Sequence, residues 1–240
     1  MSNGKNFNNY FGRIYQARYL SGIAAGLNTK TNKIGYVAAM GLDNSEVTGG
    51  IDAFALGIYS VNPDAKVYVK VTNSWYDPKG EEEAAKTLLN MNCDVIAQHC
   101  DTVYPQTLAQ EKGVYSIGYN SDMSKEAPEA CLCSVIWNWS AYYTSAVQSV
   151  IDGTWDGSNY YGGMNENLVS ITPVADFAAD TTQEKVNVAK QQILSGKNGV
   201  FDGVIETNTG ATVGTAGKTL DDSVITGGIN WYFKTVSVIE

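Results

Sequence analysis

Nine ring-bearing, amide or carboxylate residues follow short apolar runs in this chain, and their chemistry suits the binding of a flat polar molecule. They are Trp75, Tyr76, His99, Asp101, Asn120, Asp122, Trp137, Asn138 and Trp139. Aromatic rings stack on planar guests, a contact worth on the order of 1 kcal/mol beyond the area it buries. Amide and carboxylate groups donate or accept hydrogen bonds at the edge of such a guest. These residue types therefore predict a cleft for a flat polar small molecule.

The segments that precede these residues alternate between strand-like and helix-like stretches. Apolar runs of strand length occupy 33–40, 66–72, 94–98, 114–119 and 132–137, and helices are predicted at about 46–60, 105–112 and 141–151. Asp77 followed by Pro78 predicts the capped start of a further helix. This alternation implies a parallel sheet with right-handed crossovers. Because the carboxyl ends of parallel strands lie along one edge, we expect the nine residues to line one crevice.

The two ends of the chain differ from its centre. Residues 10–27 carry apolar side chains at helical spacing and predict a buried helix. After Gly153 the residues glycine, asparagine and tyrosine become frequent, and one more helix is predicted at about 183–194. The tail from Lys197 is rich in glycine, threonine and aspartate, so we expect short, irregular strands there.

Composition excludes several classes of partner. The chain of 240 residues is long enough to bury a large core. Its formal net charge of −9 and pI near 4.6 argue against nucleic acid and anionic membranes, because both would repel it. No apolar run has the length of a membrane span, and residues 1–9 lack the basic start and apolar stretch of a signal peptide. The four cysteines include no CxxC pair and the chain has one histidine, so we expect reduced, packed thiols and no metal site.

Several candidate residues have a structural interpretation beside the functional one. Trp75 and Tyr76 could fill a loop instead of facing a ligand. His99 and Asp101 could form an oriented acid/base pair, but no nucleophile motif completes a catalytic set, so no catalytic residue is predicted. A single histidine is more often structural, or a hydrogen-bond donor to a ligand.

The same choice applies to the later candidates. Asn120 and Asp122 could bind the edge of a polar ligand, or Asp122 could cap the turn that follows it. Trp137 and Trp139 flank Asn138 and could form a second stacking wall, or they could pack on the next helix. The sequence leaves both alternatives open.

Five blocks of the chain, 10–26, 33–40, 73–78, 94–102 and 113–123, resemble the basic membrane protein family. That family comprises substrate-binding lipoproteins of ABC importers and is similar to the purine nucleoside receptors. The resemblance implies an α/β fold of the type I periplasmic-binding kind, with Rossmann-like parallel-sheet lobes that close on a purine base or nucleoside held between aromatic rings. It places Trp75 where the family carries a ring for the purine.

The resemblance also bears on which purine is bound. Asn120 and Asp122 match an Asp-Ser-Asp motif whose first acid helps to hold ribose in nucleoside binders, and this chain has an asparagine there. Near Trp137 those binders tend to carry a lysine that serves the sugar, and here it is absent. Two sugar contacts thus look altered, which favours a free base such as adenine, or a slimmer ligand, over a nucleoside.

The beginning of the chain departs from the family pattern. Family members carry several βα units before the segment that matches Tyr10, so the first lobe is expected to be incomplete, and the signal peptide and lipid-anchor cysteine to be missing with it. The implied regions are 1–32, a remnant of the first lobe; 33–162, a complete α/β lobe; and 163–240, a return segment and tail. Apolar surface on the 10–27 helix would then stay open, which predicts either self-association or a tail that repacks over the helix.

The function that follows is that of an extracytoplasmic, lipid-anchored solute-binding component of an ABC importer. Its partners would be a purine-type ligand and, in the full-length protein, the transporter permease, with no cofactor and no nucleic acid. Weaker binding than in a complete receptor is expected. The alternative is a cytosolic ligand-sensing or regulatory domain of the same fold, and a third reading is a nucleoside-processing enzyme that relies on His99 and Asp101.

Overall fold

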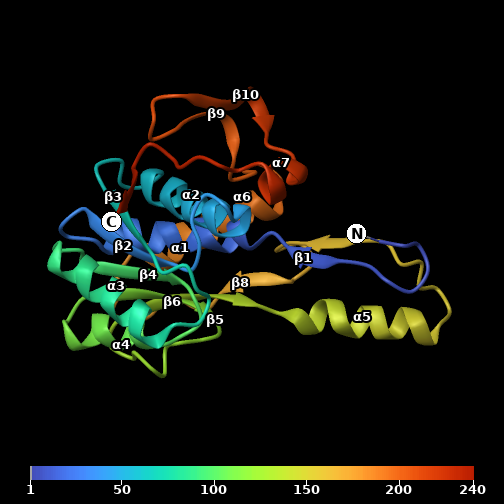
Figure 1. The fold of residues 1–240 in the computed structure, drawn as a ribbon, viewed down its shortest axis with the longest axis horizontal. Coiled ribbons are helices and arrows are strands. Elements are labelled where there is room, and N and C mark those ends of the chain that lie inside the picture. Colours follow the sequence, from blue (N-terminus) through green and yellow to red (C-terminus); the bar gives the residue numbers. More distant parts are fainter. Residues whose placement is uncertain (1) are drawn as a thin grey trace.

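The computed structural model describes residues 2–240, and a seven-stranded sheet lies at its centre (Figure 1). The strands lie in the order β11-β3-β2-β4-β5-β6-β8. Their bounds are β2 Lys33–Ala38, β3 Lys66–Val71, β4 Val95–His99, β5 Tyr115–Asn120, β6 Cys131–Trp137, β8 Val169–Ile171 and β11 Val236–Ile239. Neighbouring strands are parallel except for β6 and β8, which are antiparallel. The predicted α/β class with a mostly parallel sheet is confirmed.

Helices cover both faces of this sheet (Figure 1). On one face lie α1 (Ile14–Asn28), α2 (Ser45–Tyr59) and α6 (Thr182–Leu194), and on the other lie α3 (Pro78–Asn90) and α4 (Tyr104–Glu111). Each face has its own apolar core, one around Leu20 and Phe54 and one around Leu88 and Ile96. Such double coverage explains why the strand sequences are almost continuously apolar.

Local signals set where the helices begin. The Asn44 side chain accepts hydrogen bonds from the backbone N–H groups of Glu46 and Val47, which starts α2 directly after the loop that leaves β2. Asp77 accepts from the N–H of Gly80, with Pro78 as the first residue of α3. The capped helix predicted from these two residues is thereby confirmed.

Helices α1 and α2 cross in very close contact because glycines face a backbone. A Cβ atom on Gly22 would lie 2.1 Å from the carbonyl oxygen of Phe54, and one on Gly57 would lie 2.0 Å from that of Tyr19. No side chain fits at such a separation. The crossing fixes α2, and with it the residues at the start of α2, against the sheet.

An arm extends away from the sheet (Figure 1). It contains α5 (Trp139–Ile151) and a small parallel pair, β1 (Tyr10–Gly12) with β7 (Tyr160–Gly162). Only Tyr142 of α5 is buried. By contrast α1 buries 12 of its 15 residues, so the expectation that the 10–27 helix would leave apolar surface open was wrong. Contacts with α2 and α6 cover that helix instead.

The last part of the chain returns to the body. An antiparallel hairpin of β9 (Asp202–Glu206) and β10 (Thr212–Thr219) is followed by α7 (Asp222–Gly227), which packs on α2. Both β8 and β11 then belong to the central sheet, so this body includes segments of all three regions implied by the resemblance. The four cysteines are buried and free, as expected. From residue 2 onwards, no helix has the length and apolar character needed to cross a membrane.

Candidate functional site

Four aromatic side chains contact one another in series at the carboxyl edge of the sheet, and we call them the ring row: Trp75, His99, Tyr119 and Trp137. The centres of the Trp75 and His99 rings lie 5.7 Å apart, and those of His99 and Tyr119 lie 4.5 Å apart. The Trp137 indole N–H donates to the Tyr119 hydroxyl at 3.4 Å. The four lie at or near the carboxyl ends of β3, β4, β5 and β6, so the parallel sheet brings together residues that are far apart in sequence.

A carboxylate from a further element lies beside the ring row. Glu46 is in the first turn of α2, and its Oε1 lies 3.5 Å from His99 Nε2. The other imidazole nitrogen, Nδ1, lies 3.4 Å from the hydroxyl of Tyr36 on β2. Complete burial, and secondarily the charge of Arg18, lower the pKa of His99 to about 4. His99 is therefore a neutral ring at physiological pH.

A buried cation lies beneath the ring row. Arg18 of α1 is fully buried, and its Nη1 donates to the carbonyl of Gln98 at 2.7 Å. Its guanidinium carbon lies 4.3 Å from the centre of the Tyr119 ring, a cation–π contact. Within residues 2–240, Nε and Nη2 of Arg18 have no hydrogen-bond partner. The site thus has a positive charge below its rings and a negative charge, that of Glu46, at its side.

The loop after β4 is held by side-chain amides. Gln98 is fully buried and donates through Nε2 to the carbonyls of Cys100 and Thr102. The N–H of Asp101 donates to the carbonyl of Trp75 at 2.9 Å, which ties this loop to the one after β3. The Asp101 side chain is exposed, and the side-chain groups near the imidazole nitrogens are those of Glu46 and Tyr36. The His99–Asp101 pair considered above therefore does not form.

Three further candidates lie at the surface. Tyr76 is 69% exposed, and Asn120 ends β5 exposed, with a positive φ of 71° that asparagine tolerates. Asp122 accepts a hydrogen bond from the N–H of Ser124, and this bond lowers the pKa of its carboxyl. Asp122 thus stabilises the turn that follows β5, the structural alternative raised above.

The last candidates divide between the ring row and the arm. Trp137 belongs to the ring row, while Trp139 begins α5 and stacks on both Trp137 and Tyr143, with ring centres 4.6 and 6.1 Å apart. The Asn138 side chain donates to the carbonyl of Asn167 at 3.0 Å. Trp139 and Asn138 therefore join the sheet to the arm, and Trp137 is the indole that lies beside Tyr119.

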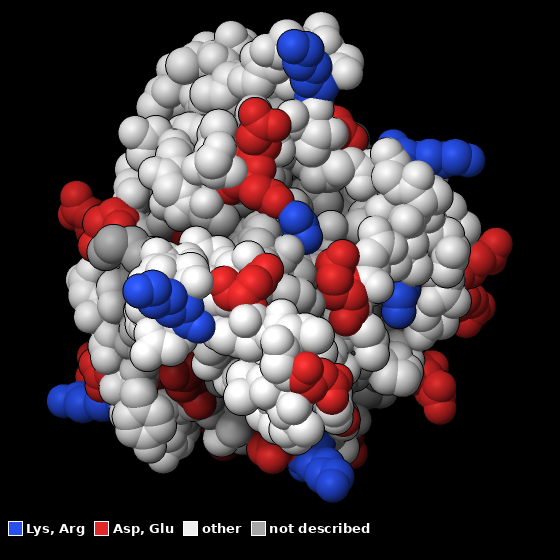
Figure 2. Space-filling model, turned by 90° about the vertical axis from the view of Figure 1, so that its right-hand side faces the viewer, with Lys and Arg blue, Asp and Glu red and all other residues white. Residues whose placement is uncertain are grey.

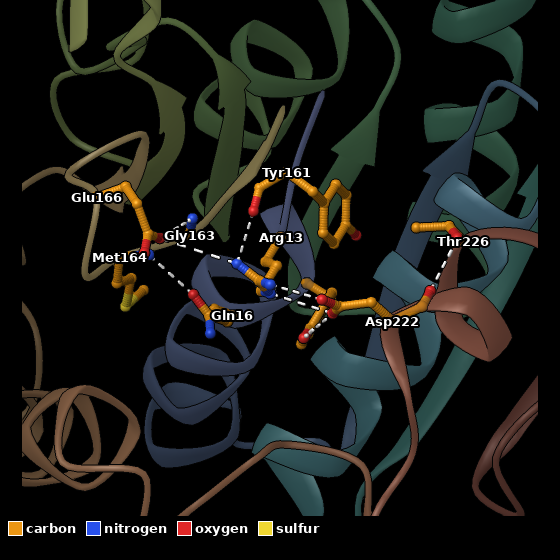
Figure 3. A network of polar contacts seen from close by, with 9 residues as sticks. Arg13, Gln16, Tyr161, Gly163, Met164, Glu166, Asp222 and Thr226 are labelled. Atoms are coloured by element: carbon orange, nitrogen blue, oxygen red, sulfur yellow. Dashed lines mark hydrogen bonds and ion pairs between the residues drawn. The ribbon is translucent and has the colours of Figure 1, made fainter. Parts of the chain in front are cut away.

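A polar network joins the arm, α1 and α7 next to the site (Figure 3). Arg13 donates to both carboxylate oxygens of Asp222 at 3.1 and 2.5 Å and to the carbonyl of Tyr161 at 2.8 Å. Gln16 accepts from the N–H of Met164 at 2.9 Å. These bonds hold the walls of a small cavity of about 60 Å³ next to the ring row, lined by Phe11, Tyr15, Glu46, Tyr161 and Ile225 among others.

Sequence reasoning did not select Glu46, Arg18 or Tyr119 as site residues. Glu46 opens the helix after the first predicted strand, so the edge argument applied to that strand would have found it. Arg18 is a charged residue amid the apolar positions of the 10–27 helix, a signal that its side chain has a special environment. Tyr119 was assigned to the predicted strand 114–119 and not to the residues that follow it. In the structure this strand ends one residue later, at Asn120.

Comparison with solved structures places this fold among the periplasmic-binding proteins. A solute-binding protein of an ABC transporter system from Aeropyrum pernix K1 is similar over 78% of this chain and 64% of that chain, with a TM-score of 0.68 and 17% sequence identity. At that identity the likeness concerns the fold.

Sequence comparison is more specific. The family model described as "ABC transporter substrate-binding protein PnrA-like" matches residues 1–200, and this chain belongs to that family. A purine-binding protein of Brucella abortus (strain 2308) is 36% identical over 231 residues, which cover 96% of this chain and 65% of the relative. A putative ABC transporter glucose-binding protein of Haloferax volcanii is 37% identical over 83% of this chain and 50% of the relative. The chain thus spans about half to two thirds of the length of these relatives.

Proposed function

We propose that this chain is a solute-binding component of an ABC importer and that the two partly exposed indoles of its ring row, Trp75 and Trp137, bind a purine-type base. The observation that carries the proposal is the contact series Trp75–His99–Tyr119, with Trp137 hydrogen-bonded to Tyr119. Stacking on flat rings is the interaction that a purine offers on both faces. The Brucella abortus relative, described as purine-binding, supports the same ligand class.

A free base is favoured over a nucleoside. Asn120 stands where nucleoside binders of the family carry an acid for ribose, and the lysine that those binders tend to carry near Trp137 is absent here. The Asn138 amide is already bonded to the carbonyl of Asn167. A ribose would therefore find fewer charged partners here than in those binders.

The cellular setting follows from the same family. The protein would act outside the cytoplasm, held by a lipid anchor, and would deliver its ligand to a transporter permease. No catalytic role is proposed, because His99 is fully buried and the groups near its nitrogens, Glu46 and Tyr36, include no serine, threonine or cysteine that it could activate. No cofactor is part of the proposal.

Adenine is expected to bind, with a dissociation constant weaker than about 1 μM, and Trp75→Ala is expected to weaken it about tenfold. Loss of one stacking face costs on the order of 1 kcal/mol, or about fivefold, and the loss of buried area raises the total to about tenfold. Saturation-transfer NMR and calorimetric titration with adenine, adenosine and guanosine measure this.

Trp155→Ala is the matched control, because Trp155 follows α5 on the arm and is not part of the ring row. Its adenine affinity should equal that of the unmodified chain. Absence of saturation transfer to any of the three compounds at millimolar concentration would refute the purine proposal, and equal losses in the two variants would refute the role of Trp75.

We also propose that the arm mediates self-association between copies of this chain. The α5 residues Tyr143, Val147, Val150 and Ile151 recur at helical spacing, and Val147 is 61% and Ile151 72% exposed. Figure 2 faces this end of the molecule and shows charged side chains scattered singly, with uncharged surface between them. An apolar helix face of this kind is stabilised when a second copy covers it.

The double variant Val147→Glu/Val150→Glu is expected to shift the chain from dimer to monomer, because two carboxylates would be buried unpaired in the contact. Sedimentation velocity at about 100 μM, well above micromolar affinity, measures it, with Val188→Glu on α6 as a control of similar exposure. A monomer for the unmodified chain at that concentration would contradict the proposal.

A further inference from the structure

We propose that Glu46 accepts a hydrogen bond from an exocyclic amino group of the ligand, so that the site selects amino-substituted flat bases over bases without that group. The inference rests on the proposed binding of a purine-type base and adds the residue that determines its specificity. The sequence analysis assigned hydrogen bonding at the ligand edge to Asn120 and Asp122 instead.

Glu46 is the carboxylate that borders both the ring row and the cavity. Its Oε1 lies 3.5 Å from His99 Nε2, and His99 contacts the rings of Trp75 and Tyr119. The side chain of Glu46 also lines the cavity of about 60 Å³ together with Phe11 and Tyr161. Its side chain is 23% exposed, whereas that of His99 is not exposed at all, so an incoming ligand reaches Glu46 and not the imidazole nitrogens.

The carboxylate has acceptor capacity that the protein does not use. A glutamate carboxylate has about four lone-pair sites and accepts hydrogen bonds only. Within residues 2–240 the Glu46 carboxylate accepts no hydrogen bond, and His99 Nε2, 3.5 Å away, has no hydrogen-bond partner. Tyr36 lies at the opposite imidazole nitrogen, so His99 approaches Glu46 from one side only.

The size of the cavity fixes which part of a ligand can occupy it. A volume of about 60 Å³ admits a few waters or a small substituent, so the rings of a bicyclic base would have to lie outside this cavity. The walls are rigid, because Arg13 bonds Tyr161 and Asp222 on two different elements (Figure 3). An amino group directed at Glu46, with its ring stacked on the row, satisfies both constraints.

The negative charge of Glu46 determines which ligand groups the site favours. A hydrogen bond to an ionised acceptor contributes more than one between neutral groups, about 1.5–3 kcal/mol. Ligand groups that carry only lone pairs could not donate a hydrogen bond to the carboxylate and would be repelled by it. Phosphate-bearing ligands would be repelled as well, because their charge is also negative. Arg18 beneath the row is fully buried, and its guanidinium faces Tyr119, so the aromatic rings separate it from the ligand.

The test is a cycle of two ligands and two proteins. Adenine and unsubstituted purine differ by the amino group, and Glu46→Gln keeps the shape of the side chain but removes its charge. The unmodified chain should bind adenine about 10-fold to 100-fold more tightly than purine, as expected for a hydrogen bond to a charged group. In Glu46→Gln that ratio should fall to below about fivefold, with purine affinity almost unchanged.

Glu184→Gln is the matched control, because Glu184 is likewise in the first turn of a helix, α6, away from the ring row. It should keep the adenine-to-purine ratio of the unmodified chain, and circular dichroism should show both variants folded. An unchanged ratio in Glu46→Gln would overturn the role of Glu46 while leaving the purine proposal standing. If neither adenine nor purine bound the unmodified chain, the role of Glu46 and the purine proposal would both be refuted.

Discussion

Gly57→Ala is expected to destabilise the fold by about 3 kcal/mol, the upper end of the usual cost of overpacking a core. The added methyl group would lie 2.0 Å from the carbonyl oxygen of Tyr19, and this atom belongs to the backbone of α1 and cannot rotate away. The α1–α2 crossing would have to open, which would disturb the apolar contacts around Leu20 and Phe54. For a chain of this size the melting temperature should fall by roughly 6–12 °C.

Gly227→Ala is the appropriate comparison. A Cβ on Gly227 would meet no atom within 4 Å, and the residue ends α7 at the surface. Alanine also loses less backbone entropy on folding than glycine, so this variant should be neutral or slightly stabilised. Thermal and urea denaturation of both variants measure the difference. Equal melting temperatures for Gly57→Ala and Gly227→Ala would show that the two helices do not cross as closely as described.

The second large effect is a loss of stability in mild acid that depends on His99. Burial, and secondarily Arg18, lower the pKa of His99 to about 4 in the folded chain, against 6.5 for the free side chain. The unfolded chain therefore binds an extra proton between these two pH values, and unfolding becomes more favourable as the pH falls from 6.5 towards 4. At about 1.36 kcal/mol for each unit of pKa difference, the loss is on the order of 3 kcal/mol.

His99→Gln isolates this contribution, since glutamine is polar but does not titrate. Its free energy of unfolding should depend less steeply on pH between 6.5 and 4 than that of the unmodified chain, with equal slopes above pH 7. Asp52 acts in the opposite direction, because burial raises the pKa of its carboxyl well above the usual value and acid then favours the folded chain. The contribution of Asp52 is the same in the unmodified chain and in His99→Gln, so it does not affect the comparison between them. Parallel curves across the whole range would show that His99 is not buried in neutral form.

Much of the fold was predictable because its signals are local. The capping pair Asp77 and Pro78, and the apolar strand runs, depend on neighbours a few residues away, and the structure has these elements within a few residues of the predicted bounds. The ends of the strands were likewise readable. Trp75, His99 and Trp137 were therefore selected correctly as residues of one sheet edge, and they do lie in one contact series with Tyr119.

The sequence pattern did not predict how the ends of the chain would pack. The apolar residues of α1 fit a helix that is buried or one that has lost its cover, and only the contacts with α2 and α6 decide between the two. Helix α5 also carries apolar residues at helical spacing, but only Tyr142 of that helix is buried. The places of β8 and β11 in the sheet required strand pairing across long stretches of chain, which no local spacing encodes.

The sequence by itself determined that this chain is an α/β protein of the PnrA-like substrate-binding family, and which strand ends carry aromatic and polar groups. Only the tertiary structure decided that Glu46 and Arg18 flank those rings and that Asp101, Asp122 and Asn138 serve loops or the surface. The physical reason is the distance along the chain over which the deciding interactions act. Periodicity and caps follow from bonds between near neighbours, whereas the partner of a side chain depends on which helix crosses which strand.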